Sequence, residues 1–301
     1  KELGWTEEDW STAAWWRQVD GGFSISRYDP GEDVTEYGAE VLGWITANLK
    51  MYARYSEAER GADSLVQAQG MLEWRVSDDG TFSAELRRVE EDQAGFDSTG
   101  LLGAIKYSHR FGTDLELYGL GQVTLDDDGG RYEDNTAIAV GGQYLFGDRS
   151  SVGGEVSTGD RGDAASLTAE YWLQPDWSLY GSYTWSTDTS QYDSLFNPNR
   201  QNGWTVGQRW RLSQQTNLFN ESQYLKDPDG SQGLANTFGM DFYPGVGWNL
   251  GFTLQDGDLT NVDGGNVDRQ AVSLNGGRTS GDTDWQSKVE YRRDRGAEDR
   301  D

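Results

Sequence analysis

Apolar and polar residues alternate along most of this chain, which is the pattern of β-strands with one apolar and one polar face. The stretch TAEYWLQPDWSLYGSYTW (168–185) shows the alternation twice, on either side of a Gln-Pro-Asp turn. Tyr171 and Leu173 share a face before the turn, and Trp177 and Leu179 share a face after it. The stretch therefore predicts a β-hairpin whose apolar face contacts either another sheet or lipid.

The same alternation predicts strand after strand from residue 19 to residue 293, and most are ten to fourteen residues long. Strands of soluble sheets average about 5–6 residues, whereas strands that cross a membrane need about 9–11. The predicted strands are 19–28, 35–56, 64–77, 80–89, 98–110, 113–124, 133–146, 149–158, 163–173, 176–186, 201–213, 216–226, 231–243, 247–256, 267–278 and 281–293. Residues 1–18 form an N-terminal segment, in which 7–17 predict a short amphipathic helix or, alternatively, 1–16 supply one more strand.

The predicted connections alternate between short and long. The short ones are DPGED (29–33), SDDG (77–80), GTD (112–114), GDR (147–149), QPD (174–176), SQQ (213–215), PGVG (244–247) and SGD (280–282). The longer polar ones include EAERGAD, EEDQAGFD, DDDGGRYED, TDTSQYDSLFNPNR and DGDLTNVDGGN. A soluble sandwich has no physical reason to keep one end short, so this rhythm favours a membrane-spanning barrel.

The faces opposite the apolar rows carry charged side chains at successive positions. Such a face cannot be a dry core, because burying unpaired charges costs far more free energy than a sheet can supply. We therefore predict that it is wet and lines a pore. The candidate pore-lining residues are Glu73, Arg75, Glu85, Arg87, Glu170, Arg209, Arg211, Glu221, Lys288, Glu290 and Arg292.

Aromatic residues gather at both ends of the predicted strands. Trp177, Trp248 and Trp285 each directly follow a short turn, and Tyr183 and Trp185 lie at the opposite end of their strand. Aromatic girdles at the two membrane interfaces are the more specific part of the membrane-barrel pattern. A soluble β-sandwich with Trp at its sheet ends is the alternative interpretation.

In these features the chain resembles the outer-membrane β-barrels of Gram-negative bacteria, the broad class that includes porins, over residues 19–293. The resemblance implies an all-β fold: a large antiparallel up-and-down transmembrane barrel of about 16–18 strands over 19–301. It also implies short periplasmic turns, longer extracellular loops, and a location in the bacterial outer membrane among its lipid and lipopolysaccharide. Such barrels usually end on an aromatic strand, whereas this chain ends RRDRGAEDRD, so we expect it to be part of a longer chain.

Composition narrows the function classes. The 301 residues include 51 acidic and 25 basic ones, giving a net charge of -26, which argues against nucleic-acid binding. The chain has no Cys, so disulfides and thiol chemistry are excluded. No run of 18 apolar residues is present, so no transmembrane helix is expected.

Little in the sequence points to catalysis or to a cofactor. The single His, His109, follows Ser108 near a strand end, and nothing else supports a nucleophile with an oriented base, so we expect no enzyme. Calcium is the one cofactor we consider, because Asp with Gly turns supplies oxygen ligands; solvated loops are the alternative. The candidate ligands are Asp126, Asp127, Asp128, Glu133 and Asp134 in one loop, and Asp256, Asp258, Asp263 and Asp268 in another.

Two functional hypotheses follow. The first is a water-filled pore for passive passage of ions or small solutes, with an acidic mouth that favours cations. Its longest loop, 187–200, carries apolar residues that would fold into the pore or onto a partner. The second is a membrane anchor or a structural subunit of a larger surface assembly, or a homo-oligomer, with a plugged or partner-filled lumen.

Overall fold

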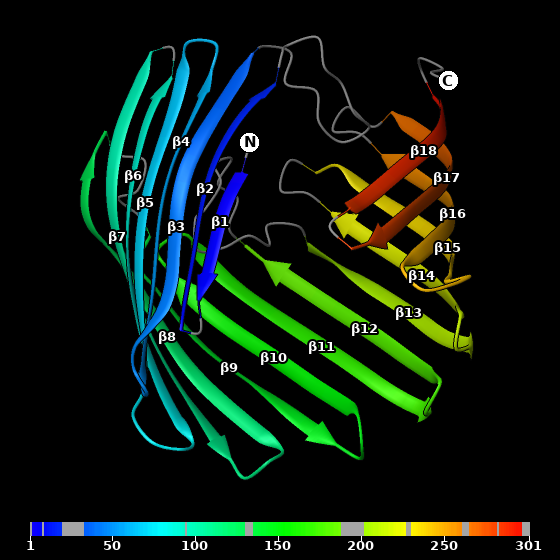
Figure 1. The fold of residues 1–301 in the computed structure, drawn as a ribbon, viewed down its shortest axis with the longest axis horizontal. Helices are drawn as coiled ribbons and strands as arrows, with labels where there is room; N and C mark the ends of the chain where they lie inside the picture. The colour runs from blue at the N-terminus through cyan, green and yellow to red at the C-terminus, as the bar shows by residue number, and fades with distance from the viewer. Residues whose placement is uncertain are drawn as a thin grey trace. The chain divides into compact units, whose positions relative to one another are not determined.

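A computed structural model describes residues 2–7, 9–19, 33–93, 95–129, 135–187, 202–226, 230–260, 265–281 and 283–296. Within these ranges eighteen β-strands follow one another along the chain (Figure 1). They are β1 (Glu2–Glu7), β2 (Trp10–Val19), β3 (Val34–Thr46), β4 (Leu49–Arg60), β5 (Asp63–Arg75), β6 (Gly80–Gln93), β7 (Phe96–Phe111), β8 (Leu115–Asp128), β9 (Ala137–Phe146), β10 (Ser150–Gly159), β11 (Gly162–Gln174), β12 (Trp177–Ser186), β13 (Asn202–Ser213), β14 (Thr216–Lys226), β15 (Gln232–Phe242), β16 (Trp248–Thr260), β17 (Asn266–Ser280) and β18 (Thr283–Arg295). The described residues contain no helix long and apolar enough to span a membrane.

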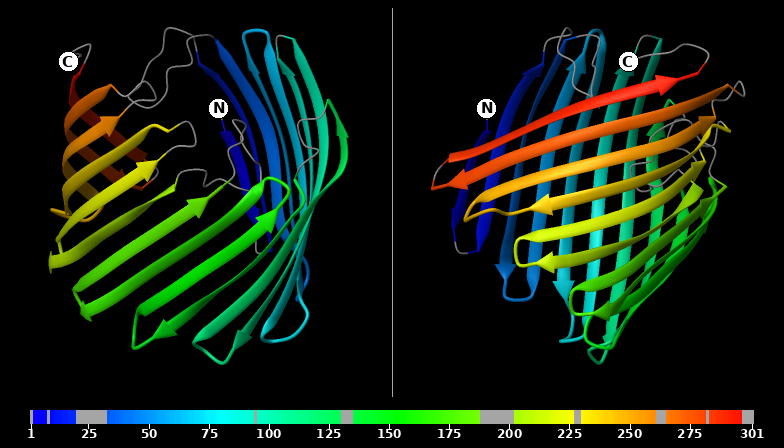
Figure 2. Two further views of the ribbon diagram at one scale, coloured as in Figure 1. Left: turned by 180° about the vertical axis from the view of Figure 1, so that it is seen from behind. Right: turned by 90° about the vertical axis from the view of Figure 1, so that its right-hand side faces the viewer.

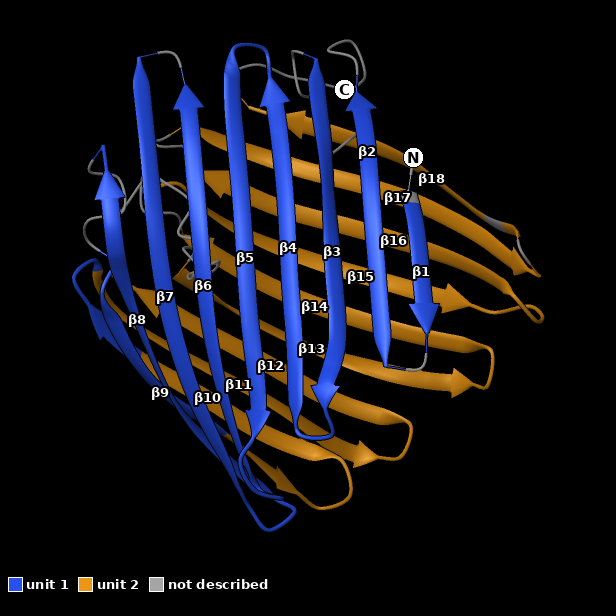
Figure 3. Cartoon of the chain, turned by 60° about the vertical axis from the view of Figure 1, so that its left-hand side comes forward, with its two compact units in different colours: residues 1–142, 157–161 blue, residues 143–156, 162–301 orange. Residues whose placement is uncertain are grey.

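Consecutive strands pair antiparallel, up and down, as Figure 2 shows from two sides. The ladder runs from β1 to β8 and again from β11 to β18. The chain divides into two compact units, drawn in different colours in Figure 3. Unit 1 comprises Lys1–Gly142 with Ser157–Arg161, and unit 2 comprises Gln143–Val156 with Gly162–Asp301.

The N-terminal third differs from the sequence prediction in two places. The helix considered for 7–17 is wrong, because β1 and β2 form an antiparallel pair there. The single strand predicted over 35–56 is also wrong, because a turn at residues 47–48 divides it into β3 and β4. This turn contains neither Gly nor Pro, and Asn48 is its one turn-favouring residue, so the apolar alternation runs almost uninterrupted across it. The strand predicted over 19–28 lies outside the described residues except Val19.

The loop end of unit 1 also differs from the prediction. EAERGAD and EEDQAGFD are not long loops: β4 continues to Arg60 and β5 begins at Asp63. Gly61 closes this two-residue turn with φ of 58° and Gly95 lies in the next one with φ of 89°, a left-handed conformation that favours glycine. Both strand faces are polar here, so the alternation stops in the sequence although the hydrogen-bonded ladder continues.

The distribution of apolar residues is inverted relative to a soluble protein. Among the described residues the buried hydrophobics are Val89, Leu102 and Ala139. Large apolar side chains are instead exposed, for example Ile105 at 57% and Val289 at 69%. Fully burying such a side chain is worth about 1.5–3 kcal/mol, so dozens of exposed ones require an apolar environment outside the sheet. The exposed apolar face is therefore the membrane-facing surface.

Candidate functional site

The register of the ladders places every predicted pore-lining residue on the face opposite the apolar rows, which we call the polar face. In unit 1, Glu73 stands between Lys50 and Ser83. In unit 2, Arg209 stands between Ser178 and Phe219. Residues directly opposite one another in an antiparallel ladder point to the same side of the sheet. Their exposure to a pore stays a prediction.

Glu85 and Arg87 form a compact polar group on β6. Arg87 donates from Nε and Nη2 to Glu85 Oε1, at 3.2 and 2.8 Å, and Gln69 Nε2 donates to the same oxygen at 2.8 Å. The two charged side chains are only 17% and 19% exposed. The partial burial and the three hydrogen bonds to one oxygen hold these side chains in place, and the charges of Glu85 and Arg87 neutralise each other.

Cations on the polar face of unit 1 lie against aromatic rings. The Arg54 guanidinium lies 4.9 Å from the Trp15 ring centre. Trp44 has Lys50 at 5.8 Å on β4 and Arg75 at 5.7 Å on β5. A cation within about 6 Å of a ring centre is attracted by the ring quadrupole. These rings hold the long basic side chains close to the wall.

Unit 2 carries a four-residue cluster on the same face. The Tyr180 hydroxyl donates to Glu221 Oε2 at 2.8 Å, across the intervening strand β13. Arg209 lies 4.3 Å from the Tyr180 ring centre and 3.8 Å from Glu170 Oε1. Arg209 is the most accessible member shown, with its side chain 61% exposed.

A glycine makes the reach of Tyr180 possible. Gly207 stands directly opposite Tyr180, and a Cβ at this position would overlap the Tyr180 ring. The ring therefore lies flat over β13, which brings its hydroxyl to β14. Trp15 lies over Gly38 in unit 1 in the same way. An aromatic ring that covers a cross-strand glycine shields the exposed backbone and fixes the ring.

The last two strands carry an ion-pair network. Arg269 donates from Nε and Nη2 to the two oxygens of Asp294, both at 3.0 Å, a bidentate geometry. Arg292 Nε lies 3.5 Å from Asp294 Oδ2, and Lys288 pairs with Glu290. Of the predicted residues here, Lys288, Glu290 and Arg292 are thus paired along their own strand.

Where a ladder register places them, the described side chains on the polar face are balanced in charge. Its basic residues are Arg17, Lys50, Arg54, Arg60, Arg75, Arg87, Lys106, Arg110, Arg209, Arg211, Arg269, Lys288 and Arg292. Its acidic residues are Glu36, Glu40, Asp63, Glu73, Glu85, Glu91, Glu116, Asp127, Glu170, Glu221, Asp241, Glu290 and Asp294. The excess negative charge of the chain therefore lies elsewhere.

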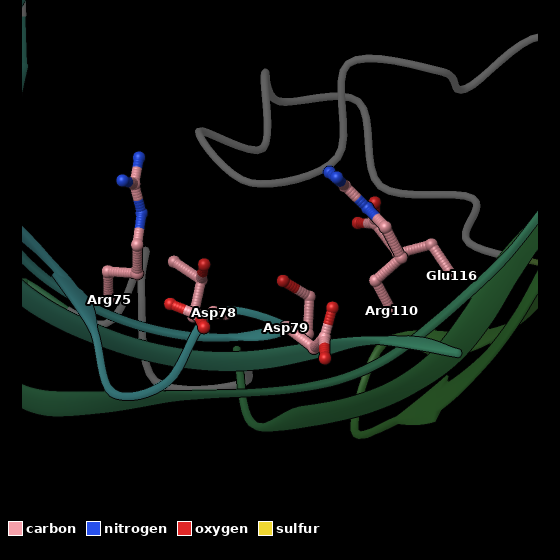
Figure 4. A pocket seen from close by; sticks show the side chains of 7 residues that line it. Arg75, Asp78, Asp79, Arg110 and Glu116 are labelled. Atoms are coloured by element: carbon pink, nitrogen blue, oxygen red, sulfur yellow. The ribbon is translucent and has the colours of Figure 1, made fainter. Parts of the chain in front are cut away.

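A mixed-charge pocket of about 350 Å³ lies at the turn end of β5–β8. Figure 4 shows Arg75 on one side and Arg110 with Glu116 on the other, with Asp78 and Asp79 between them. Arg75 was predicted from the sequence, whereas the others were not. The pocket extends the balanced charge of the polar face to the short turns.

Part of the polar face in unit 1 is closed to water. Val89 and Leu102 are 0% and 1% exposed, although the register places both on this face. Ser98 beside them is 1% exposed. These residues contrast with Arg209 in unit 2 and show that the polar face is not uniformly open.

The apolar face carries aromatic residues where the sequence predicts girdles. At the turn ends the His109 ring contacts Phe111 at 4.5 Å between ring centres, and the Trp177 ring lies 5.8 Å from Trp210. At the loop end of unit 2, Trp204 and Tyr224 stack at 6.3 Å. These rings have the position and partly apolar character of interfacial anchors.

The candidate chemical groups are placed as follows. Ser108 faces the polar side and His109 the apolar side, so the two side chains point away from one another. Asp126 and Asp127 fall on opposite faces beside a β-bulge in the β7–β8 ladder. Within the described ranges, no three acidic or His side chains are grouped as a metal site would require. Glu133, Asp134, Asp263 and residues 188–200 lie outside those ranges.

Sequence reasoning missed the aromatic partners of the charged residues. Trp15, Trp44 and Tyr180 each hold a cation on the polar face, and Asp294 joins two arginines. For Trp15 and Trp44 the available signal was parity, because Arg17 and Glu40 fall on the same alternate positions of their strands. Tyr180 has no charged residue on its own strand, so the sequence carries no such signal for it. They were passed over because aromatic residues were assigned to the membrane interfaces.

Comparison with known proteins supports the fold. No protein-family model matches the chain, and no curated protein sequence matches it. Among solved structures it is similar to the alcaligin outer membrane receptor FauA of Bordetella pertussis, with a TM-score of 0.57 and 10% identity over 96% of this chain and 62% of FauA. The ferric enterobactin receptor PfeA of Pseudomonas aeruginosa gives 0.55 and 11%, over 95% of this chain and 62% of PfeA.

OprD of Pseudomonas aeruginosa gives a TM-score of 0.51 and 11% identity, over 88% of this chain and 85% of OprD. The chain has the fold of bacterial outer-membrane β-barrels. This confirms the predicted all-β, antiparallel, up-and-down class and agrees with the predicted outer-membrane location. The chain spans about 62% of the length of the receptors that it matches.

Proposed function

We propose that this chain forms a water-filled pore in the bacterial outer membrane, through which ions or small solutes pass passively. The observation that carries the proposal is the polar face. In each unit, charged and hydrogen-bonding side chains occupy it across the described strand pairs, opposite an exposed apolar face. A barrel of about 16 strands or more encloses an aqueous lumen unless something fills it.

Selectivity in this proposal arises at the pore mouth. The polar face is balanced, whereas the whole chain has a net charge of -26. The acidic residues in excess lie in the connections and at the loop ends of the strands. An acidic pore mouth concentrates cations. Because the Debye length falls from about 10 Å at 0.1 M salt to about 3 Å at 1 M, this preference should fade as salt rises.

Conductance in planar bilayers tests the proposal. The full chain, refolded and inserted, should give steady single-channel steps, and its reversal potential should favour cations at low salt and less so at high salt. Arg209→Gln removes an accessible charge from the polar face and should raise cation preference. Arg88→Gln is the matched control, because the Arg88 side chain is 60% exposed but lies on the membrane-facing side, opposite the polar face. Equal effects of the two variants would contradict a pore lined by the polar face.

A second candidate is an anchor or structural subunit whose lumen is partly filled. The burial of Val89, Leu102 and Ser98 on the polar face favours it. Stable insertion without conductance would contradict the pore and support this alternative. The proposed surroundings are the same in both cases: outer-membrane lipid and lipopolysaccharide, with a homo-oligomer or a larger assembly as further partners. Neither candidate includes nucleic acid, catalysis or a resident cofactor.

A further inference from the structure

The membrane-facing side of unit 2 changes abruptly from apolar to polar between two neighbouring rows. The first row runs Phe238, Leu254, Val272 and Tyr291 across β15–β18. The next row toward the loop end runs Asn236, Asp256, Gln270 and Arg293 on the same strands, with Ser222 on β14 beside it. On a membrane-spanning wall, such a boundary marks the level of the lipid head groups.

A groove of about 620 Å³ lies along this boundary. Both rows line it, so its surface is apolar on one side and hydrogen-bonding on the other. The apolar side is accessible: Phe238 is 42% exposed, Leu254 41%, Val272 40% and Tyr291 59%. A groove with these two sides fits one amphiphilic molecule better than it fits a purely apolar chain or a free ion.

Hydrogen bonds along the polar row hold its side chains in place. The Ser222 hydroxyl donates to Asn236 Oδ1 at 2.7 Å, and Gln270 Nε2 donates to Asp256 Oδ1 at 3.1 Å. Because Asn236 accepts through its oxygen, its amide nitrogen keeps two N–H donors for another acceptor. Gln270 keeps a second N–H donor for the same reason.

Arg293 completes the row and sets the charge of the ligand. A guanidinium has five N–H donors, so other contacts leave donors for a further oxygen acceptor. Charge-assisted bonds from Arg to phosphate are the strongest hydrogen bonds available at such a level, and the planar group fits phosphate with two bonds. Arg295 lies one row further out, opposite Asp268.

We propose that this groove binds a phosphate-bearing lipid of the membrane. Its acyl chain lies on Phe238, Leu254, Val272 and Tyr291, and its phosphate accepts from Arg293, Asn236 and Gln270. Asp256 faces the same groove and lowers the affinity. The proposal concerns the outer surface of the wall, so it goes beyond the proposed pore and requires only that this face contact lipid.

Lipid retention tests the proposal. The full chain is exchanged into phosphatidylcholine nanodiscs containing a small fraction of either lipopolysaccharide or phosphatidylglycerol, then extracted in mild detergent, and its bound lipids are counted by native mass spectrometry. The wild type should retain a phosphate-bearing lipid. The double variant Arg293→Gln, Asn236→Leu should retain it at least about tenfold less, because it removes the charge-assisted hydrogen bonds from Arg293.

Arg278→Gln is the matched control, because Arg278 lies on the membrane-facing side of β17 against Trp248 at the opposite, turn end of the strand. It should retain lipid as the wild type does. Asp256→Asn should raise retention. Equal retention by the double variant and the control would overturn the proposal, and so would displacement of the lipid by inorganic phosphate alone, which would indicate a simple anion site. Retention is read without any conductance, so failure of the pore and failure of the lipid site are distinguished.

Discussion

At the loop ends of the strands, the membrane-facing side carries different charges in the two units, although the apolar rows next to these positions are similar. In unit 1 these loop-end positions of the membrane-facing side carry Glu57, Glu90, Asp92 and Asp97. Arg88 forms a salt bridge with Glu90 at 2.7 Å. In unit 2 the corresponding positions carry amides and arginines together with Asp256, Asp258 and Asp268. The same membrane band is therefore bordered by a mainly acidic margin in one unit and a mixed margin in the other.

This difference predicts that the two units attract different lipid head groups. An acidic margin repels phosphate head groups unless divalent cations stand between them, whereas N–H donors and a guanidinium attract them. Area and hydropathy alone would not separate the two margins, because their apolar rows are alike. The side chains at the loop-end border of the apolar rows therefore determine which lipid head groups each unit attracts.

The largest expected effect comes from breaking what the two units share, the apolar band. Ile105→Arg in unit 1 and Val289→Arg in unit 2 should each lower the free energy of unfolding by about 2–4 kcal/mol, because a charge then faces the bilayer centre. Denaturant unfolding from lipid vesicles measures this loss.

The matched controls lie on the polar face: Ala104→Arg, one residue from Ile105, and Gln286→Arg, three residues from Val289. They should cost far less. A large loss in the controls with little loss in the band variants would mean that the two faces are assigned the wrong way round.

The next largest effect concerns the glycines under aromatic rings, which both units use on the polar face. Gly38→Ala and Gly207→Ala should each cost about 1–3 kcal/mol, because the added Cβ overlaps Trp15 or Tyr180. Gly70→Ala and Gly181→Ala are the controls, since a Cβ there meets open space or ordinary contacts. The same unfolding assay compares them, and equal costs at all four positions would contradict the flat-ring arrangement.

The smallest effect sharpens the comparison of the margins. Each margin has one pair of aspartates directly opposite one another, Asp92 with Asp97 in unit 1 and Asp258 with Asp268 in unit 2. Asp97→Asn and Asp258→Asn should each stabilise the fold by about 0.2–1 kcal/mol by removing like-charge repulsion; Asp258 is chosen because Asp268 also stands opposite Arg295. The gain should shrink in high salt.

Asp126→Asn serves as the control for the aspartate pairs, because Asp126 faces Leu101 and not an acid. A gain at Asp258 without one at Asp97 would show that divalent ions already neutralise the acidic margin of unit 1. Adding a chelator to the unfolding assay would then restore the gain at Asp97.

Much of the fold could be predicted from the sequence, because alternation and turn residues act locally. The strands after residue 63 were located to within a few residues, since one face of each had to be apolar. The β3–β4 turn was missed, because Asn48 is its only turn-favouring residue and apolar stretches continue on both sides of it. The ends of β4 and β6 could not be found either, because both faces of a strand are polar once it leaves the membrane.

The candidate site was predictable in its face but not in its contacts. Parity alone places Arg209 and Glu221 on one side of the sheet. It does not reveal that Tyr180 links them, because that depends on the register across three strands and on the absence of a side chain at Gly207. The proposed lipid groove of unit 2 likewise depends on the registers of the four ladders between β14 and β18, so no local sequence pattern predicts it.

The two-residue turn at Gly61–Ala62 also affects how this protein meets its surroundings. A protease needs an extended, unpaired segment of backbone to fit its cleft, and such segments concentrate in exposed loop tips. Here the ladder continues to Arg60 and Asp63, directly opposite one another at the turn. This hairpin therefore offers an external protease almost nothing to cut.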